Sequence, residues 1–306
     1  MYDIIGDVHG HATLLKKLLK TLGYAKSIHG YSHPDRKAVF VGDFLNRGPE
    51  IRQTISLIRS MVDSGAAYAV LGNHEINNIL YYLKDEKHIP LLKKRGKRYF
   101  SVTETIQEFA AYPDEWKEYR RWMRRLPLFL ELDGIRVAHA YWSNHKIELI
   151  RAMVPPGKIS RSVFRNLILE PTSPLTQAIL QTTRGVHLLL PKDLRVFDNR
   201  GRAHRFFRIK WWELPAGQTF GAFSYESKFE LPAYTIPPEV YPEYELYSPD
   251  DPPMFFGHYC RGEGPQIVGD NLCCVDSCVN VSRSLAAYRW NGERILNPDN
   301  ILVVKG

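Results

Sequence analysis

The sequence has no long hydrophobic run. None of its segments approaches the roughly 18 uninterrupted apolar residues that a membrane-spanning helix requires, although 44% of the 306 residues are apolar. The N-terminus begins with a short strand-like segment, where a secretory signal peptide would have a basic and then an apolar segment. We therefore expect no membrane partner and a cytoplasmic location.

Cysteine is scarce, and the few cysteines do not have the spacing of a zinc ribbon. All of them lie close together near the C-terminus, at Cys260, Cys273, Cys274 and Cys278. Because they fall on strand-like sequence, we expect buried reduced thiols rather than zinc ligands or a disulfide. Internal repeats and low-complexity tracts are absent as well, so the chain reads as globular.

The charge is unbalanced toward the basic side, with 41 basic and 33 acidic residues and a net charge of +8. Such a charge attracts anionic substrates or partners. The basic residues concentrate in three segments, 93–98, 120–125 and 200–210. Solvated helix faces and loops explain such clusters more often than a nucleic-acid groove does, so we treat nucleic acid as the less favoured partner.

The first 75 residues alternate strand and helix patterns. Strands are predicted at 2–5, 37–41 and 66–71, separated by amphipathic helices that end near Gly23 and Gly65. This rhythm is typical of parallel β-α-β units, in which ligand-binding groups collect at the carboxyl ends of the strands.

The rest of the chain is predicted as one continuous domain, residues 1–306, with an insertion or lid at about 141–253. Residues 76–125 have helical patterns, and 128–132 and 135–140 form a hairpin that turns at Asp133-Gly134. In the lid, helices are predicted near 160 and 175 and a hairpin near 198–201, before a segment rich in Pro, Tyr and Glu. A strand at 254–256 follows. Antiparallel strands are then predicted at 266–268, 271–276, 285–290 and 301–304, and Asn291-Gly292 is the predicted turn of one hairpin.

Three glycine-bracketed motifs follow the first three strands. They are Gly6-Asp7-Val8-His9-Gly10, Gly42-Asp43-Phe44-Leu45-Asn46-Arg47-Gly48 and Gly72-Asn73-His74-Glu75. In an extended backbone Asp7 and His9 face the same side, as half of a metal site does. A single D-x-H pair is usually a surface loop, but three such strand ends in succession indicate a shared site. Gly6 and Gly10 suit a tight turn that approaches a ligand closely, so larger residues there should be harmful.

Six side chains that end strands are candidate metal ligands, and they form two sets if Asp43 is shared. Each lone histidine among them has an alternative interpretation as a core residue. A carboxylate can bridge two divalent ions about 3.5 to 4 Å apart, an arrangement that generates a hydroxide nucleophile and suits phosphate esters. Mixed oxygen and nitrogen ligands favour Mn²⁺, which we expect, or Fe, Zn²⁺, Co²⁺ or Ni²⁺; Mg²⁺ would want fewer imidazoles. The six candidates are Asp7, His9, Asp43, Asn73, His139 and His258.

The motifs GDVHG, GDFLNRG and GNHE, followed by single histidines at later strand ends, resemble those of the calcineurin-type metallophosphoesterases. The similar branch contains serine/threonine phosphoprotein phosphatases and bacterial diadenosine tetraphosphatase. The resemblance is dense over residues 7–75 and looser at His139 and His258. It implies an α/β (α+β) fold, a four-layer α-β-β-α sandwich with a dinuclear metal centre.

The resemblance also implies roles for single residues. Arg47 would bind phosphate, His74 would act as the acid, and His139 and His258 would complete the second and the first metal site respectively. The chain departs from the family at Asn46, where an Asp usually orients the histidine of GNHE. Asn46 can hold the ring but cannot supply charge, so we expect a weaker acid and a preference for good leaving groups. A second departure is Ala140-Tyr141, where the phosphoprotein phosphatases commonly have glycines.

Other candidate residues have less context. Arg184 and Arg261, each beside a glycine, are alternatives for holding a second phosphate oxygen. His29 and His33 are expected in solvent. Structural roles are expected for His11, His88, His145, His187 and His204.

We expect a metal-dependent phosphatase that hydrolyses phosphomonoesters on a protein or a small molecule. The first alternative is a hydrolase of dinucleoside polyphosphates such as diadenosine tetraphosphate, which the lid and the basic residues could hold. Further alternatives are a catalytically weak phosphate-binding regulatory module, suggested by Asn46, and an enzyme that removes end phosphates from nucleic acid.

Overall fold

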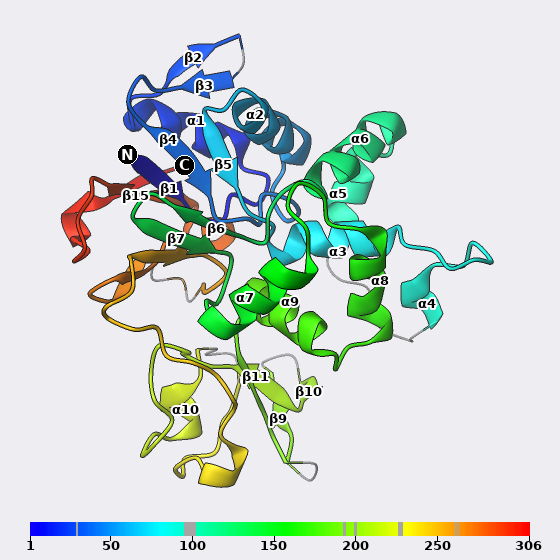
Figure 1. The fold of residues 1–306 in the computed structure, drawn as a ribbon, viewed down its shortest axis with the longest axis vertical. Helices are drawn as coiled ribbons and strands as arrows, with labels where there is room; N and C mark the ends of the chain where they lie inside the picture. Colours follow the sequence, from blue (N-terminus) through cyan, green and yellow to red (C-terminus); the bar gives the residue numbers. More distant parts are fainter. Residues whose placement is uncertain are drawn as a thin grey trace.

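Two mixed β-sheets pack face to face at the centre of the molecule (Figure 1). The computed structural model describes residues 1–28, 30–94, 102–191, 194–198, 201–225, 229–260, 262 and 264–306. Within these residues each central sheet has five strands, and three further pairs of short strands lie outside them.

The first sheet contains the predicted β-α-β units. Its strand order is β16-β15-β1-β4-β5, in which β1, β4 and β5 are parallel and β15 and β16 are antiparallel. The strands are β1 (Tyr2–Ile5), β4 (Lys37–Phe40), β5 (Ala67–Ala69), β15 (Ser284–Trp290) and β16 (Ile301–Lys305). Helices α1 (Ala12–Thr21) and α2 (Ile51–Asp63) connect the parallel strands, and their leucine and isoleucine stripes are buried against the sheet. The β-α-β prediction is confirmed.

The second sheet has the order β13-β14-β12-β7-β6. The hairpin turns at Asp133-Gly134, as expected, because Leu132 pairs with Ile135. Strand β12 is parallel to both β7 and β14, so the antiparallel prediction for β14 holds only for its contact with β13. The strands are β6 (Phe129–Leu132), β7 (Ile135–Ala138), β12 (Met254–Phe256), β13 (Gln266–Gly269) and β14 (Leu272–Cys274).

The sheets and their covering segments form the layers of a sandwich. Apolar side chains of both sheets, among them Ile4, Val39, Val137 and Phe255, fill the space between them. Helices α1 and α2 cover the outer face of the first sheet. The outer face of the second sheet packs against buried aromatic residues of the lid, including Trp211. The predicted α/β sandwich is therefore confirmed. Its fourth layer, on the outer face of the second sheet, contains short strands as well as helices.

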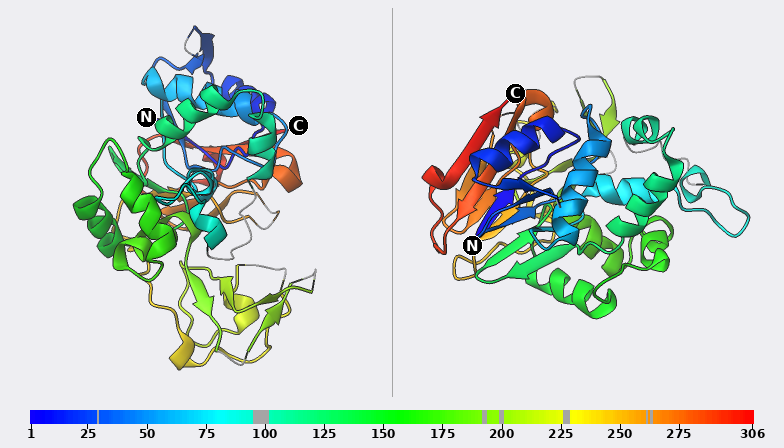
Figure 2. Two further views of the ribbon diagram at one scale, coloured as in Figure 1. Left: turned by 90° about the vertical axis from the view of Figure 1, so that its right-hand side faces the viewer. Right: turned by 90° about the horizontal axis from the view of Figure 1, so that it is seen from above.

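Most of the remaining helices gather on one side of the sheets (Figure 2). Before the hairpin they are α3 (Asn73–Tyr81), α4 (Leu91–Lys94), α5 (Thr103–Glu108) and α6 (Pro113–Met123). After it come α7 (Asn144–Met153), α8 (Arg161–Leu169) and α9 (Pro174–Arg184). Helices α8 and α9 match the expected ones near 160 and 175, whereas α7 was not anticipated.

The lid forms a lobe below the sheets in Figure 1. Tyr141 anchors it, because the Tyr141 hydroxyl accepts a hydrogen bond from the backbone N–H of Glu245 at 2.7 Å. Ala140-Tyr141 is thus part of the lid attachment. Helices α7, α8 and α9 also fall within the predicted lid range. The elements of the lobe itself are β8 (His187–Leu189), β9 (Val196–Phe197), β10 (Ala203–His204), β11 (Phe206–Arg208), α10 (Phe220–Phe223) and a 3-10 helix at Pro238–Val240.

Smaller elements complete the fold. They are the pair β2 (Ala25–Ser27) and β3 (Gly30–Ser32), helix α11 (Val279–Ser282) and a 3-10 helix at Pro298–Asn300. The expected tight hairpin at Asn291-Gly292 is wrong: β15 and β16 do pair, but residues 291–300 connect them and include that 3-10 helix. Strands β9 and β10 form the expected hairpin, whose tip lies outside the described residues.

Candidate metal centre

The carboxyl ends of strands from both sheets meet at one place. Strands β1, β4 and β5 lead into the three glycine-bracketed motifs, and β7 and β12 lead into His139 and His258. Because β7 and β12 are parallel neighbours, the residues after them lie at the same edge of the second sheet. Chain segments far apart in sequence therefore converge, as the strand-end pattern predicted.

Asp43 lies at the centre of this convergence. Its Oδ2 is 3.8 Å from His9 Nε2 and 3.8 Å from His74 Nε2, and its Oδ1 is 3.3 Å from His139 Nε2. His139 Nε2 is also 3.1 Å from Asn73 Oδ1, and His9 Nε2 is 4.0 Å from Asp7 Oδ2. The structure brings these predicted ligands together in a buried cluster.

The imidazole rings are oriented as metal ligands are. His9 Nδ1 contacts the carbonyl oxygen of Leu45 at 2.9 Å, and His139 Nδ1 contacts that of Val41 at 2.8 Å. Since a carbonyl can only accept, each Nδ1 carries a proton, and whenever the ring is neutral its Nε2 lone pair faces the Asp43 carboxylate. Two acceptors facing each other in a buried site need a proton or a cation between them, and backbone contacts at the far nitrogen are typical of metal-bound histidines. The donor set therefore fits divalent metal.

His258 falls in a different half of the centre from the one that the family resemblance implied. Its ring clusters with Asp43 and His139, with one ligand atom of each within 4.8 Å of the others, while His9 and His74 form a second group with Asp43. The backbone N–H of His258 donates to the Asp7 carboxylate at 3.2 Å. The parallel pairing of β7 and β12 explains this, since it places the two histidines beside each other.

Asn46 holds His74 in a chain of buried hydrogen bonds. Asn78 Nδ2 donates to the carbonyl oxygen of His74 at 3.0 Å and to Asn46 Oδ1 at 3.2 Å, so the Asn46 amide nitrogen must face His74. That nitrogen is 2.7 Å from His74 Nδ1 and donates to it. The hydroxyl of Thr105 also donates to Asn46 Oδ1, at 2.5 Å. The proton of neutral His74 is therefore on Nε2, which points toward Asp43 and the centre.

Three residues of the centre were assigned no role from the sequence, and of these only Glu75 belongs to a motif. Asn78 and Thr105 fix Asn46, and Glu75 holds the second motif in place. The Glu75 carboxylate accepts hydrogen bonds from the backbone N–H groups of Asp43, Phe44, Leu45 and Gly72, at 2.8 to 3.2 Å. A buried acid at the N-terminus of a helix was a usable signal for Glu75. Thr105 gave none, because its contact joins residues 59 positions apart.

The electrostatics of the centre follow from burial and close charges. Burial lowers the pKa of His74 to about 4, and that of His9 falls well below its ordinary value for the same reason. Burial also lowers the pKa of His139, but the Asp43 carboxylate outweighs it and raises this pKa to about 10. Burial raises the pKa of Asp43, yet the neighbouring imidazoles, His139 foremost, hold it well below its usual range. Asp43 is thus the anionic focus of the site.

The predicted phosphate-binding arginines lie at different positions. Arg47 is exposed, has a φ of 67°, and its charge acts on both His9 and His74. Arg184, at the end of α9, donates to Asn77 Oδ1 at 2.8 Å and lines one cavity with Asn73 and His258. His187 lines the same cavity, although a purely structural role was expected for it. Arg261 lies outside the described residues, as do His29 and residues 95–98.

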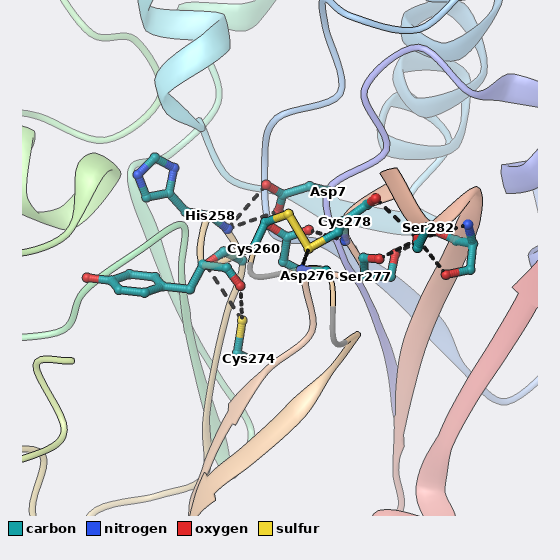
Figure 3. The surroundings of a disulfide bond; sticks show 12 residues. Asp7, His258, Cys260, Cys274, Asp276, Ser277, Cys278 and Ser282 are labelled. Atoms are coloured by element: carbon teal, nitrogen blue, oxygen red, sulfur yellow. Dashed lines mark hydrogen bonds between the residues drawn. A yellow bond between two sulfur atoms is a disulfide. The ribbon is translucent and has the colours of Figure 1, made fainter. Parts of the chain in front are cut away.

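The expectation of reduced thiols is wrong for two of the four cysteines. Cys260 and Cys278 form a disulfide, with a Cα–Cα distance of 5.1 Å (Figure 3). Cys260 comes two residues after His258, and Cys278 comes two residues after Asp276. Parallel strands β12 and β14 carry the two cysteines to the same edge, which a spacing of 18 residues does not reveal. Cys273 and Cys274 are free and buried, as expected. Disulfides are usual in oxidising compartments, and the cytoplasmic location stays a prediction.

The chain was compared with known proteins. A family model described as calcineurin-like phosphoesterase matches residues 2–226. The chain belongs to this family. The resemblance in the three motifs is thereby confirmed, and with it the expectation of divalent metal.

Relatives and solved structures extend this result. A bis(5′-nucleosyl)-tetraphosphatase PrpE of Geobacillus sp. is 36% identical over 146 residues, 45% of this chain and 56% of the relative. The protein of the same name from Halalkalibacterium halodurans is 44% identical over 147 residues, with the same coverage. The chain thus spans about half the length of these relatives. A protein serine/threonine phosphatase of Saccharomyces cerevisiae shares the fold, with a TM-score of 0.51 at 14% identity over 99% of this chain and 78% of that one.

Within the described residues, no helix combines the length and the hydropathy of a membrane span. The basic segment 120–125 is partly engaged within the molecule. Arg120 lies 3.9 Å from the ring centre of Tyr82, and Arg124 Nη2 donates to the carbonyl oxygen of Ile159 at 3.2 Å. These contacts favour the interpretation of the segment as structural rather than as a nucleic-acid groove.

Proposed function

We propose that this calcineurin-like phosphoesterase is a dinuclear metal-dependent phosphatase that hydrolyses phosphomonoesters. The observation that carries the proposal is the position of the Asp43 carboxylate, within 3.8 Å of imidazole nitrogens from three separate chain segments. One cation would be held by Asp7, His9 and Asp43, and the other by Asp43, Asn73, His139 and His258. Mn²⁺ is the expected metal, since the ligands mix oxygen and nitrogen without thiolate.

Two bound divalent cations would supply an activated water and neutralise phosphoryl oxygens. The chain's own residues do the rest. Arg47 offers its guanidinium to the phosphoryl oxygens, for which its planar fork is well suited. His74 presents its Nε2–H toward the leaving group, while Asn46 keeps the ring in that tautomer. Because Asn46 is neutral, His74 donates a hydrogen bond more readily than a full proton, which favours good leaving groups.

Dinucleoside polyphosphates are the second candidate substrate class. The names of the PrpE relatives support it. Phosphoanhydrides also have good leaving groups, which a neutral Asn46 beside His74 favours. The cavity beside Asn73 and His258 supports it too, because it contains both Arg184 and Arg208 and so offers more cationic groups than one phosphate needs.

A substrate panel tests the proposal. The protein is reconstituted with Mn²⁺ and assayed with a phosphopeptide, p-nitrophenyl phosphate and diadenosine tetraphosphate, and the products are identified. Release of inorganic phosphate from the first two supports a phosphomonoesterase, and cleavage of the third into nucleotides supports the second candidate. A protein that binds metal but turns over none of the three would be a phosphate-binding module, and the proposed activity would be wrong.

A further inference from the structure

One face of the β8–β11 ribbon lies open beside the metal centre. The two strands are antiparallel, and they pair His187 with Arg208, Leu188 with Phe207, and Leu189 with Phe206. Leu188 and Phe207 are fully buried in the lid core. The other four side chains point to the opposite face, because neighbouring residues of a strand alternate. All four line the same cavity.

This cavity begins at the metal centre. Asn73 and His258, two of the candidate ligands, lie in its wall, and its volume is about 540 Å³. That size is ordinary for a small-molecule site. Arg208 joins the ribbon to the centre, since its Nη1 donates to the carbonyl oxygen of His258 at 2.6 Å. Arg184 enters the cavity from α9, where Asn77 accepts its hydrogen bond.

The groups along the cavity are ordered by chemistry. The pair His187 and Arg208 stands next to His258, and the apolar pair Leu189 and Phe206 stands two residues farther along the ribbon, about 7 Å away at the usual rise per residue. Leu189 and Phe206 are 64% and 50% exposed, which is high for such side chains. The ring of Phe206 is fixed edge to face against His187, with centroids 5.4 Å apart. An anionic group thus fits near the metals and a flat apolar group fits beyond it.

The facing wall is polar. Gln177, Gln181 and Arg184 recur on one side of α9 at the spacing of successive helical turns and line the cavity. The side-chain oxygen of Gln181 is buried and has no hydrogen-bond partner in the described part of the chain. If the Gln181 amide turned toward the cavity, a ligand donor such as a ribose hydroxyl or an exocyclic amine would satisfy it.

We propose that this cavity is a nucleotide subsite, in which the base stacks on Phe206 and Leu189 while Arg184 and Arg208 bind the phosphates that lead to the metal centre. The inference rests on the proposed phosphoesterase activity and favours the second candidate substrate class, nucleoside polyphosphates, over simple phosphomonoesters. An aromatic ring bonded directly to the scissile phosphate, as in phosphotyrosine, would lie among the arginines and would not reach the apolar pair.

Binding measurements on the Mn²⁺-loaded protein test the subsite without turnover. The probes are adenosine 5′-(α,β-methylene)diphosphate and methylenediphosphonate, which share the same P–C–P group, contain no phosphoanhydride, and differ in the nucleoside. Calorimetry should show that Phe206→Ala lowers the affinity for the nucleotide analogue about tenfold. This is the size expected for the loss of one base-stacking contact. Its affinity for methylenediphosphonate should change by less than about twofold, because that probe does not reach the ribbon's distal end.

Phe197→Ala is the matched control. Phe197 is 52% exposed, nearly the same as Phe206, and lies in the same lid on β9, outside the cavity. This variant should bind both probes like the original protein. Thermal unfolding of both variants checks that each is folded.

Several outcomes would overturn the subsite. Equal affinities of Phe206→Ala and Phe197→Ala for the nucleotide analogue would remove the role of Phe206. A tenfold loss of phenylphosphonate affinity in Phe206→Ala would show that Phe206 contacts a phosphorylated aromatic ring instead of a nucleotide base. Binding of methylenediphosphonate without binding of the nucleotide analogue would reject the subsite and leave the phosphatase intact. The phosphoesterase activity on which the subsite rests fails only if the substrate panel shows no hydrolysis of any of its three compounds.

Discussion

The metal centre and the lid differ in how much freedom their backbones have. Five residues of the centre, none of them glycine, have φ values between 42° and 67°: His9, Asp43, Asn46, Arg47 and His258. Among the described residues of the lid, 141–253, every residue with positive φ is a glycine. Such conformations cost free energy outside glycine and persist only where the surroundings enforce them.

The glycines show the same contrast. A Cβ on Gly257 would lie 2.0 Å from Asp7 Oδ1, and one on Gly72 would lie 2.2 Å from Asp43 Oδ1. In the lid, a Cβ on Gly221 would meet nothing within 4 Å, whereas one on Gly185, beside the cavity, would lie 2.1 Å from the Tyr259 hydroxyl oxygen. The strand-end loops are therefore fixed by the ligands they hold, while the lid surface can vary. From this difference we infer that the sandwich fixes the geometry of the candidate metal centre, and we propose that the predicted lid influences the choice of substrate.

The largest effect is expected from removing the shared carboxylate. Asp43→Asn should lower p-nitrophenyl phosphate turnover at least about 1,000-fold, because both cation sites lose the same ligand charge. Elemental analysis should show less than two metal ions per chain. Asp250→Asn, on the exposed surface of the lid, should keep both the metal and the activity. Full metal content and activity in Asp43→Asn would refute the shared site.

A methyl group at Gly257 should test the constraint on the backbone. Gly257→Ala should lower activity about 100-fold, since displacing a site group by about 1 Å can have that effect and the new Cβ overlaps Asp7. Gly221→Ala lies in α10 and should be neutral or stabilise the fold by about 0.5 to 1 kcal/mol. Turnover and thermal unfolding of both variants measure the contrast. Equal losses in the two variants would contradict it.

The disulfide should stabilise the edge that carries His258. Replacing Cys260 and Cys278 together by Ser should lower the free energy of unfolding by about 3 kcal/mol, the loop-closure value for a bridge of this span. Thermal unfolding with and without dithiothreitol provides the control. The reductant should destabilise the original protein to the level of the double variant and leave the double variant unchanged. If dithiothreitol left the thermal unfolding of the original protein unchanged, the protein would contain no disulfide bridge.

The smallest expected effect concerns leaving groups. Asn46→Asp should raise the ratio of alkyl to aryl phosphate turnover about tenfold. The well-known loss of four powers of ten on the reverse change in a protease triad is an upper bound, since here metals share the work. The reason is that Asp can stabilise a protonated His74, which Asn cannot. Steady-state rates on both substrates give the ratio, and no change in it would refute this role of position 46.

The convergence of the candidate metal ligands was predictable because these residues follow strands. A parallel β-α-β pattern sends every carboxyl end to one edge, so the motifs alone indicated that Asp7, Asp43 and Asn73 meet. His258 was placed with the other half of the site, since the motif does not show that β12 lies beside β7. Thr105 was missed for a similar reason: its contact with Asn46 crosses 59 positions, and no local pattern records it.

The cysteines and the ribbon show the limit most clearly. Cys260 and Cys278 become neighbours only because β12 and β14 are parallel, and Phe206 reaches the metal centre's cavity only because β11 pairs with β8.

By itself the sequence determined the β-α-β order of β1, α1, β4, α2 and β5, the types of candidate ligand and the family, but it did not reveal the pair β2 and β3. Periodicity and turn residues act between residues that are close in the chain, so they can be recognised in the sequence alone. Only the tertiary structure decided which histidine joins which half of the centre, how Asn46 is turned, and which lid residues face the cavity. These depend on strand pairing and on hydrogen bonds between distant segments, whose energies no local pattern contains.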